Sequence, residues 1–275
     1  MNGSAASRVR VLIPVGLGLN CEDETAHAFR LLGVEPDLVH LTDLLTARHG
    51  RRLAEYQLIV FIGGFSYGDH VAGGFVLATR IRAHLLADLR AFLSRGGLAL
   101  GICNGFQALV RLGLLPGPDG GEHDFVQRAD LGPNDRLGYR NSWVRLGVDP
   151  RAHGLWTRGL DELELPARHG EGKFLVPSQQ ELERLDRTGQ VAFRYLDDAG
   201  EPTERWPFNP NGSPGGVAGV TDRSGRILGL MPHPDAFLHL CHHPRWRHGG
   251  RGAHRSRADG IELFRAGLRG AAETV

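Results

Sequence analysis

Short apolar stretches recur along the first hundred residues, each followed by a turn and a segment with helical spacing. Four of these stretches have the length and composition of buried β-strands, at residues 9–15, 36–41, 58–62 and 98–102. The third, Leu58 to Ile62, is apolar without a break, which is typical of a central strand covered on both faces. Between the third and fourth stretches, apolar residues at spacings of three and four predict one long helix over residues 75–92, ending at Gly96-Gly97.

This alternation of strands and helices predicts an α/β fold, a flavodoxin-like doubly wound and mostly parallel sheet with helices on both faces. From about residue 116 to 215 the pattern changes to short strands broken by Gly, Pro and Asp, which indicates a β-rich annex. A hairpin then runs from residues 216–220 through a turn at 222–225 to 226–231, and a helix over 259–268 closes the chain. We therefore expect residues 1–275 to form a single domain.

Composition excludes several classes of protein. The 275 residues carry a formal net charge of +1, which gives no overall attraction to nucleic acid or to an anionic membrane. No apolar run has the length of a membrane span, and the first residues lack the apolar core of a signal peptide. The three cysteines are few and odd in number, which argues against a disulfide framework and favours a reducing compartment, the cytoplasm by default.

The sharpest chemical signal is Cys103, at the junction of the fourth strand and the helix that follows it. Gly101 and Gly105 stand two residues to either side, an arrangement typical of a nucleophile elbow with Cys in place of Ser. The helix that begins at Asn104 presents free N–H groups and partial positive charge, which favour a thiolate. The alternative is a buried structural cysteine at a strand end, which is common but does not explain the paired glycines.

Cys21 is the competing thiol. Asn20 before it is a candidate N-cap, and three acidic residues, Glu22, Asp23 and Glu24, follow it in the first helical turn. Neighbouring carboxylates oppose the formation of a thiolate. We therefore expect Cys21 to be structural.

A thiolate needs an imidazole to move protons, and the imidazole needs an acceptor that fixes its orientation. His233 and Asp235 follow the hairpin and, two residues apart in an extended segment, they can face the same side. The loop that begins at Gly63-Gly64 follows the neighbouring strand, so its amides are candidates to join the amide of Asn104 as an oxyanion hole. With 14 histidines in the chain, spacing alone does not single out His233.

Four motifs now occur in order: Gly-Gly-Phe-Ser-Tyr-Gly-Asp at 63–69, Gly-Ile-Cys-Asn-Gly-Phe-Gln at 101–107, Asn-Pro-Asn-Gly-Ser at 209–213 and Met-Pro-His-Pro at 231–234. In these the chain resembles the glutaminase component of phosphoribosylformylglycinamidine synthase, a class I, triad-type glutamine amidotransferase. The likeness covers most of the chain. The family usually has Glu after His-Pro-, whereas Asp235 here is one methylene shorter.

The resemblance implies a triad of Cys103, His233 and Asp235 that releases ammonia from glutamine through a thioester. It implies oxyanion contacts from Gly63, Gly64 and Asn104 and substrate contacts from Gln107 and Ser142. The ammonia is expected to pass to a synthetase subunit that makes phosphoribosylformylglycinamidine in de novo purine biosynthesis. ATP and Mg²⁺ would then be used by that partner rather than by this chain, and the resemblance also allows for a small accessory subunit.

Other functions find less support. The glycines near residue 63 and the segment around Lys173 lack the Gly-Lys-Ser/Thr of a phosphate loop, so nucleotide chemistry is not expected in this chain. His239, Cys241, His242 and His243 lack the spacing of a zinc site, and no metal is expected. Two alternatives stay open: a thiol protein of the same fold that is a peptidase, chaperone or redox sensor, and a catalytically silent binding subunit.

The segment 239–257 is basic and rich in histidine, with five arginines and no acid of its own. It is either a solvated loop or a docking element for a partner, because it begins just after Asp235. Composition does not decide between these two interpretations.

Overall fold

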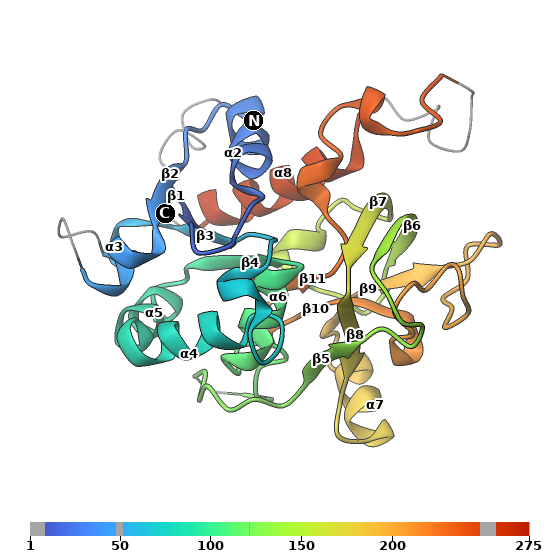
Figure 1. Ribbon diagram of the computed structural model, residues 1–275, viewed down its shortest axis with the longest axis horizontal. Helices are drawn as coiled ribbons and strands as arrows, with labels where there is room; N and C mark the ends of the chain where they lie inside the picture. The colour runs from blue at the N-terminus through green and yellow to red at the C-terminus, as the bar shows by residue number, and fades with distance from the viewer. Residues whose placement is uncertain (1–8, 48–51, 121, 248–256, 275) are drawn as a thin grey trace.

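One nine-stranded sheet, in the order β2-β1-β3-β4-β11-β10-β9-β6-β7, runs through the molecule (Figure 1). The computed structural model of the chain describes residues 9–47, 52–120, 122–247 and 257–274. Five neighbouring strands are parallel to one another: β2 Asp37–His40, β1 Val11–Val15, β3 Leu58–Phe61, β4 Leu98–Ile102 and β11 Ile227–Leu230. Their order is that of a doubly wound, flavodoxin-like sheet, as predicted.

The remaining four strands continue the same sheet in antiparallel fashion: β10 Val217–Thr221, β9 Val191–Leu196, β6 Arg140–Val148 and β7 Glu162–His169. A separate two-stranded ribbon pairs β5 Asp130–Pro133 with β8 Glu171–Leu175. The β-rich annex predicted for residues 116–215 is therefore largely an extension of the central sheet. It also contains a helix that the pattern did not predict, α7 Gln179–Arg187, whose N-cap Ser178 accepts a hydrogen bond from the Glu181 amide.

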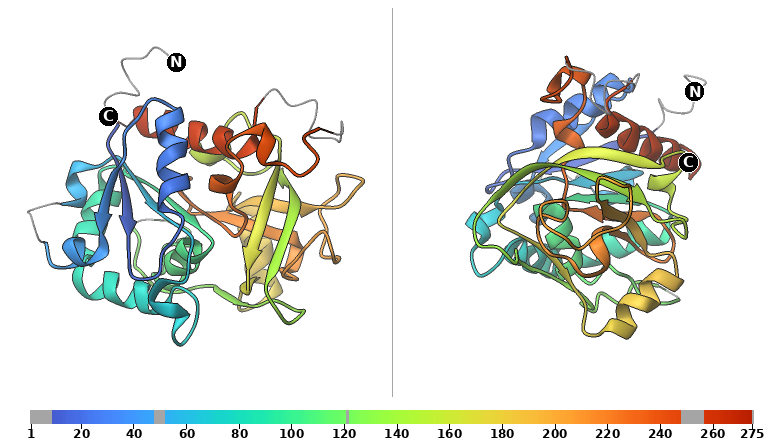
Figure 2. Two further views of the ribbon diagram at one scale, coloured as in Figure 1. Left: turned by 45° about the horizontal axis from the view of Figure 1, so that its top comes forward. Right: turned by 90° about the vertical axis from the view of Figure 1, so that its right-hand side faces the viewer.

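Helices cover both faces of the parallel half (Figure 2). On one face lie α2 Glu22–Leu31 and α8 Asp259–Ala272, and on the other lie α3 Leu41–Leu45, α4 Phe75–His84, α5 Leu86–Ser94 and α6 Asn104–Arg111. Short 3₁₀ turns connect these elements: η2 Leu53–Glu55, η3 Ser66–Asp69, η4 Leu155–Thr157, η5 Pro214–Gly216, η6 Pro234–Ala236 and η7 Leu240–His242. Because of this double cover, every residue of β3, β4 and β11 is buried.

Two local predictions were wrong. The helix expected over residues 75–92 is two helices, α4 and α5, because Leu85 leaves the helical region at φ −122° and ψ 4°. No Pro or Gly marks the break, so the apolar spacing continues through it. The N-cap of α2 is Cys21 rather than Asn20, and its side chain makes no capping hydrogen bond. In the described ranges, no helix is long and apolar enough to cross a membrane.

Candidate active site

Cys103 stands at a sharp corner between β4 and α6. Its backbone has φ 50° and ψ −106°, a conformation that costs a residue with a side chain about 1–3 kcal/mol. The Cys103 amide donates to the Leu230 carbonyl (2.9 Å), which ties the corner to the neighbouring strand β11. Cys103 is 7% exposed, and its Sγ lies 3.5 Å from the Arg168 carbonyl oxygen. The sequence-predicted elbow is therefore present, with the strain at the cysteine itself.

Gly105 explains how α6 can start so close to the sheet. A Cβ atom at this position would lie 1.9 Å from the Phe61 carbonyl oxygen, a backbone atom of β3. No side chain can be accommodated at that separation. The glycine thus permits the close approach that brings the first turn of α6 over the end of β3.

His233 and Asp235 follow β11, the strand beside β4, so they reach the same edge of the sheet as Cys103. Both are buried, with 4% and 1% exposure. The His233 Nδ1 atom lies 3.3 Å from Asp235 Oδ1 and 3.4 Å from Oδ2, so the shorter carboxylate does reach the imidazole. The His233 amide also donates to the Pro166 carbonyl (2.7 Å), which holds this segment against β7.

The electrostatics of His233 set two opposing effects against each other. Burial by itself would lower the pKa of His233. The charge of Asp235, the hydrogen bond to its carboxylate and contacts with the Cys103 and Cys21 thiols act in the other direction, and together they raise this pKa well above its ordinary value. An imidazolium is therefore stabilised here, which is the protonation state that a thiolate partner requires.

Gly64 and Asn104 offer the two amides expected for an oxyanion hole. Gly64 follows β3 and lines the same cavity as Cys103, and Asn104 is the first residue of α6. Within the described ranges, neither amide N–H donates a hydrogen bond to the protein. Gly63 has a different place: it packs against His233, and its carbonyl accepts from the Asn20 amide (3.2 Å).

The side chains of Asn104 and Gln107 form a buried network under this edge. Asn104 Nδ2 donates to Asp69 Oδ1 (2.7 Å) and to Gln107 Oε1 (3.0 Å), while Asn104 Oδ1 accepts from the Ser66 amide (3.2 Å). Gln107 Nε2 in turn donates to the Glu171 carbonyl (3.1 Å). The network joins the loop after β3 to β8, so these polar side chains fix the walls of the site.

The motif at residues 209–213 has a structural explanation. Asn211 Nδ2 donates to the Gly172 carbonyl (2.8 Å), and Ser213 Oγ accepts from the Phe174 amide (2.9 Å). Both side chains are fully buried. They clamp β8, the strand that carries Glu171 into the site, so this motif positions a cavity wall and does not itself face the thiol.

These groups surround a cavity of about 570 Å³, a size typical of small-molecule sites. Cys103, His233, Gly64 and Gln107 line it, whereas Ser142 does not. Ser142 lies on β6 with a buried Oγ that has no hydrogen-bond partner in the described part of the chain, and the next residue, Trp143, packs edge-on against Phe237. Of the paired strands β6 and β7, it is β7 that reaches the cavity, through Arg168 and His169.

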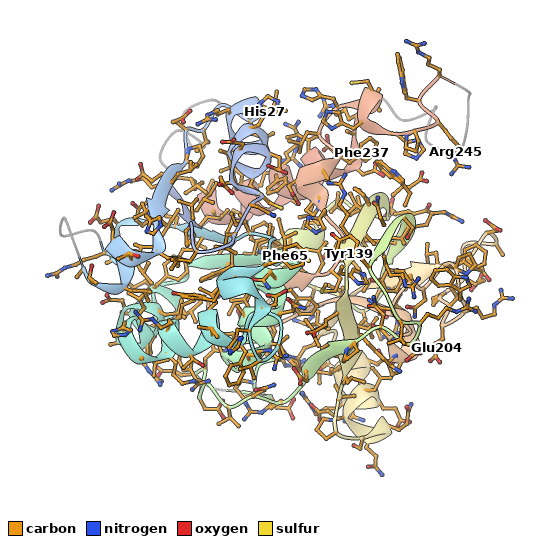
Figure 3. The ribbon with its side chains drawn as sticks, in the orientation of Figure 1. His27, Phe65, Tyr139, Glu204, Phe237 and Arg245 are labelled. Carbon is orange, nitrogen blue, oxygen red and sulfur yellow. The ribbon has the colours of Figure 1, made fainter. Side chains whose placement is uncertain are left out.

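Sequence reasoning missed several residues of the cavity wall. They are Glu24 and Asp69 near the first strands, Phe65 and Tyr139 at the mouth, and Arg168, His169 and Glu171 at the end of β7 and the start of β8. Phe65 and Tyr139 come from opposite halves of the sheet and lie side by side, with ring centroids 6.4 Å apart (Figure 3). The only local signal for β7 was the alternation in residues 162–165, which Pro166 interrupts.

His169 is a buried imidazole that is poorly suited to act as a general base. Burial, and secondly the positive charge of His233, lower the pKa of His169 to about 3. Its Nδ1 is hydrogen-bonded to Asn134 Oδ1 (3.1 Å). His169 therefore stays neutral beside the cavity.

In the described part of the basic segment, residues 239–247 and 257, the histidine side chains contact separate partners. His239 Nε2 lies 3.0 Å from His27 Nε2, and His243 Nε2 lies 3.2 Å from Glu164 Oε1. Cys241 is exposed, and all three cysteines of the chain are free. Arg251 and Arg255 fall outside the described residues.

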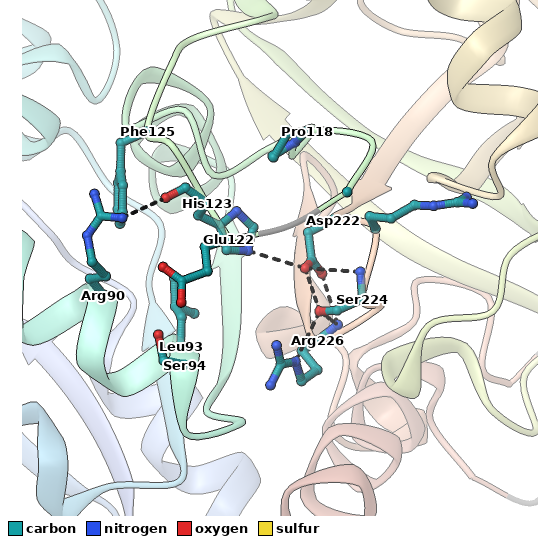
Figure 4. Close-up of a pocket in the computed structure, with 12 residues that line it drawn as sticks. Arg90, Leu93, Ser94, Pro118, Glu122, His123, Phe125, Asp222, Ser224 and Arg226 are labelled. Atoms are coloured by element: carbon teal, nitrogen blue, oxygen red, sulfur yellow. Dashed lines mark hydrogen bonds and ion pairs between the residues drawn. The ribbon is translucent and has the colours of Figure 1, made fainter.

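A second cavity, of about 330 Å³, lies at the turn between β10 and β11 (Figure 4). Asp222 is buried in its wall and faces His123, with Oδ2 3.4 Å from Nε2. Asp222 also accepts hydrogen bonds from the amides of Arg226 and Ile227. This carboxylate therefore holds the turn and anchors the loop that carries His123.

Asp222→Asn should lower the free energy of unfolding at neutral pH by about 1–3 kcal/mol, because it weakens buried bonds to a charged acceptor. Burial would raise the pKa of Asp222, but hydrogen bonds from His123, Ser224 and the Ile227 amide lower it below 3.8. The stabilisation that the Asp222 carboxylate provides is thus fully present above pH 3.8, the pKa of an unperturbed Asp. It is lost as the pH falls through the lower pKa that Asp222 has in the folded state. Urea unfolding of Asp222→Asn should show a weaker acid dependence than the wild type, while exposed Asp88→Asn should behave as the wild type.

Comparisons with known proteins agree with this geometry. The family model of the CobB/CobQ-like glutamine amidotransferase domain matches residues 8–269. A relative from Dehalococcoides mccartyi, named phosphoribosylformylglycinamidine synthase subunit PurQ, is 41% identical over 260 residues, which cover 94% of this chain and 96% of that protein. A relative of the same name from Methanococcus maripaludis is 40% identical over 241 residues, or 86% of each chain.

Among solved structures, one chain in the structure of PurLQS from Thermotoga maritima superposes on this chain with a TM-score of 0.69. The two are 29% identical, and the match covers 95% of this chain and 98% of that chain. The same fold, at 14% identity and a TM-score of 0.52, occurs in a Thermoplasma acidophilum protein whose name associates it with GMP synthase. The chain therefore belongs to the CobB/CobQ-like glutamine amidotransferase family and, within it, to the family of phosphoribosylformylglycinamidine synthase subunits PurQ.

Proposed function

We propose that this chain, working as a single domain, hydrolyses glutamine to glutamate and ammonia and supplies the ammonia to a synthetase that makes phosphoribosylformylglycinamidine. One observation carries the proposal: a thiol on a strained elbow shares a cavity with a buried His233–Asp235 pair and with two amides that have no acceptor in the described part of the chain. The relatives cited above are named as synthase subunits, and none of them is named as a peptidase, a chaperone or a redox sensor.

The chemistry follows from these positions. The Cys103 thiolate adds to the carboxamide carbon of glutamine, and the oxyanion that forms accepts hydrogen bonds from the Gly64 and Asn104 amides. His233 gives its proton to the departing nitrogen, so ammonia leaves and a glutamyl thioester remains. His233 then takes a proton from water, which attacks the thioester and releases glutamate and the thiolate.

Charged groups around the cavity suit a free amino acid. Arg168 can pair with the α-carboxylate of glutamine, and the carboxylates of Glu24, Asp69 and Glu171 can pair with its α-ammonium group. Partial burial is the largest influence on both acids and raises the pKa of Glu24 and of Asp69. Gln107, already bonded to Asn104 and Glu171, would present the rest of its carboxamide to the substrate.

The synthetase would be a separate subunit, as the name PurLQS suggests for the Thermotoga maritima complex. The proposal assigns ATP and Mg²⁺ to that subunit, and it leaves room for a small accessory subunit. Phe65 and Tyr139 are exposed rings that line the cavity of Cys103, and a partner that retains ammonia would have to cover them.

A diazoketone analogue of glutamine tests the activity directly. Incubation should stop glutamate release and add one label at Cys103, located by peptide mass spectrometry, and excess glutamine should protect the thiol. Labelling of Cys21 or Cys241 instead would contradict the assignment. So would an enzyme that stays unlabelled and still hydrolyses glutamine. A peptidase or chaperone of this fold would remain unlabelled.

A variant in which serine replaces the five arginines of the basic segment should associate more slowly with the synthetase, and the rate of association should no longer depend on salt. The five are Arg245, Arg247, Arg251, Arg255 and Arg257. In the described residues, Arg247 lies over the exposed Trp246 ring at 4.7 Å, a pair suited to docking. Surface plasmon resonance at two salt concentrations measures the effect. The control is a variant in which serine replaces five exposed arginines elsewhere: Arg80, Arg95, Arg158, Arg187 and Arg223. Equal on-rates for the two variants would mean that the segment is only solvated chain.

A further inference from the structure

A second thiol lies beside the triad and takes no part in the chemistry above. Cys21, at the start of α2, is 8% exposed and lines the same cavity as Cys103. The Cys21 sulfur, a ring nitrogen of His233 and a carboxylate oxygen of Asp235 all lie within 4.8 Å of one another. Three buried side chains with sulfur, nitrogen and oxygen donors therefore converge, although Cys21 is far from the other two in the sequence.

Gly63 places no side chain beside Cys21 and His233. A Cβ atom on Gly63 would lie 3.1 Å from the Cys21 sulfur and 2.7 Å from His233 Cε1. Any other residue at position 63 would push the thiol and the imidazole apart. Gly63, expected from the sequence to contribute to the oxyanion hole, lets the Cys21 sulfur lie next to the His233 ring.

Two polar atoms of the group lack hydrogen-bond partners in the part of the chain that the structure describes. They are His233 Nε2 and Asp235 Oδ1, both buried. The Cys21 sulfur lies 3.5 Å from Asn20 Oδ1 and also contacts the His233 ring. His233 contacts both thiols, and Asp235 Oδ1 lies 3.3 Å from His233 Nδ1, so the contacts of the group hold its sulfur, nitrogen and oxygen donors together at one place.

We propose that Cys21, His233 and Asp235 form a binding site for Zn²⁺ that switches the active site off. Zinc accepts thiolate, imidazole and carboxylate ligands at about 2.0–2.3 Å, and a fourth position can hold water. Such bond lengths place ligand atoms about 3.5 Å apart. The three donors lie within 4.8 Å of one another, and His233 Nδ1 and Asp235 Oδ1 are already 3.3 Å apart, so a small rearrangement suffices. The Cys21 proton passes to water on binding, and the thiolate and the Asp235 carboxylate balance the charge of the cation.

Zinc in this place is incompatible with turnover. A His233 nitrogen that coordinates the cation cannot exchange protons with the substrate, and Asp235 no longer orients the ring. The inhibitory part of this inference rests on the proposed glutaminase function. The binding part does not, because it concerns only the affinity of three side chains for a cation.

The test uses the untagged full chain and Co²⁺ as a spectroscopic substitute for Zn²⁺. Wild type should give the near-ultraviolet charge-transfer band of a cobalt thiolate at one equivalent, and Zn²⁺ should displace it. Cys21→Ala should lose this band and raise the half-inhibitory Zn²⁺ concentration by at least about tenfold, the smallest effect expected even for the loss of an outer-shell partner. Cys241→Ala, which changes the exposed thiol, should retain both the band and the inhibition.

Cys103→Ala separates this site from the catalytic thiol. The variant should keep the cobalt band although it cannot turn over, so the binding result stands even where glutamine hydrolysis fails. A wild type without a thiolate band, or a band that survives Cys21→Ala and disappears in Cys103→Ala, would overturn the site. Binding at Cys21 without any loss of glutaminase activity would overturn the switch.

Discussion

Cys103→Ala should reduce glutamine hydrolysis by about 10⁴-fold or more, because the thioester can no longer form. The fold should survive this change. Cys103 is confined by backbone contacts of the elbow, such as its amide bond to the Leu230 carbonyl, and alanine retains them. Glutamate release at saturating glutamine measures the loss, and urea unfolding shows whether the fold is intact. Residual turnover near the wild-type rate in a pure preparation would remove Cys103 from the mechanism.

Cys21→Ala is the matched control for this experiment. Cys21 is the other buried cysteine of the same cavity, and burial, its largest influence, raises the pKa of its thiol to about 11. A thiol with that pKa is protonated at neutral pH and is a poor nucleophile. The variant should hydrolyse glutamine at close to the wild-type rate. If it lost turnover with unchanged stability, the two cysteines would have to exchange roles.

The parallel half of the sheet and the elbow were predictable because their signals are local. Each central strand there is buried on both faces, so its sequence is apolar throughout, as in residues 58–62 and 98–102. The order of neighbouring strands then follows from the winding rule, and it brings the ends of β3, β4 and β11 together. Cys103 and the amides of Gly64 and Asn104 could be expected at these ends from the pattern alone, whereas His233 and Asp235 were distinguished from the other histidines and acids only by the family resemblance.

The far wall of the cavity was not predictable in this way. Arg168 and His169 reach the site because β7 pairs with β6 and lies against the His233 segment through the Pro166 carbonyl. These contacts join residues far apart in the sequence, and a proline within the strand hides its pattern. Ser142 was chosen by resemblance on the neighbouring strand, where its side chain does not meet the cavity.

The basic segment shows that composition alone also misjudges how much of a segment's charge is unpaired. From composition it carries no compensating acid, yet Arg245 lies 3.4 Å from Glu164 and Arg257 lies 3.5 Å from Glu262. Both acids come from outside the segment, on β7 and α8. Net charge summed over a window therefore overstates the free positive charge, and Arg247 beside Trp246 is the better candidate for a docking contact.

The shorter carboxylate at position 235 raises the question of how far the third member of the triad matters. In the structure Asp235 is buried, its Oδ2 is hydrogen-bonded to His233 Nδ1 (3.4 Å), and its Oδ1 lies 3.3 Å from the same nitrogen as an ion pair. Burial lowers the pKa of His233, and Asp235 is the principal group that opposes this effect. Removal of the carboxylate should therefore affect both the orientation and the protonation of the ring.

Asp235→Ala should slow glutamine hydrolysis by up to about 10⁴-fold, the loss seen when an orienting carboxylate is removed from a serine protease triad. The pKa of His233, followed by NMR of its ring protons, should fall in this variant because burial is no longer opposed. Asp235→Glu should retain activity, since it restores the residue that the family usually carries and keeps the charge. The decisive comparison is kcat for the two variants at equal stability. A fully active alanine variant with an unchanged His233 pKa would mean that the imidazole is held by other contacts and that Asp235 is not the third member of the triad.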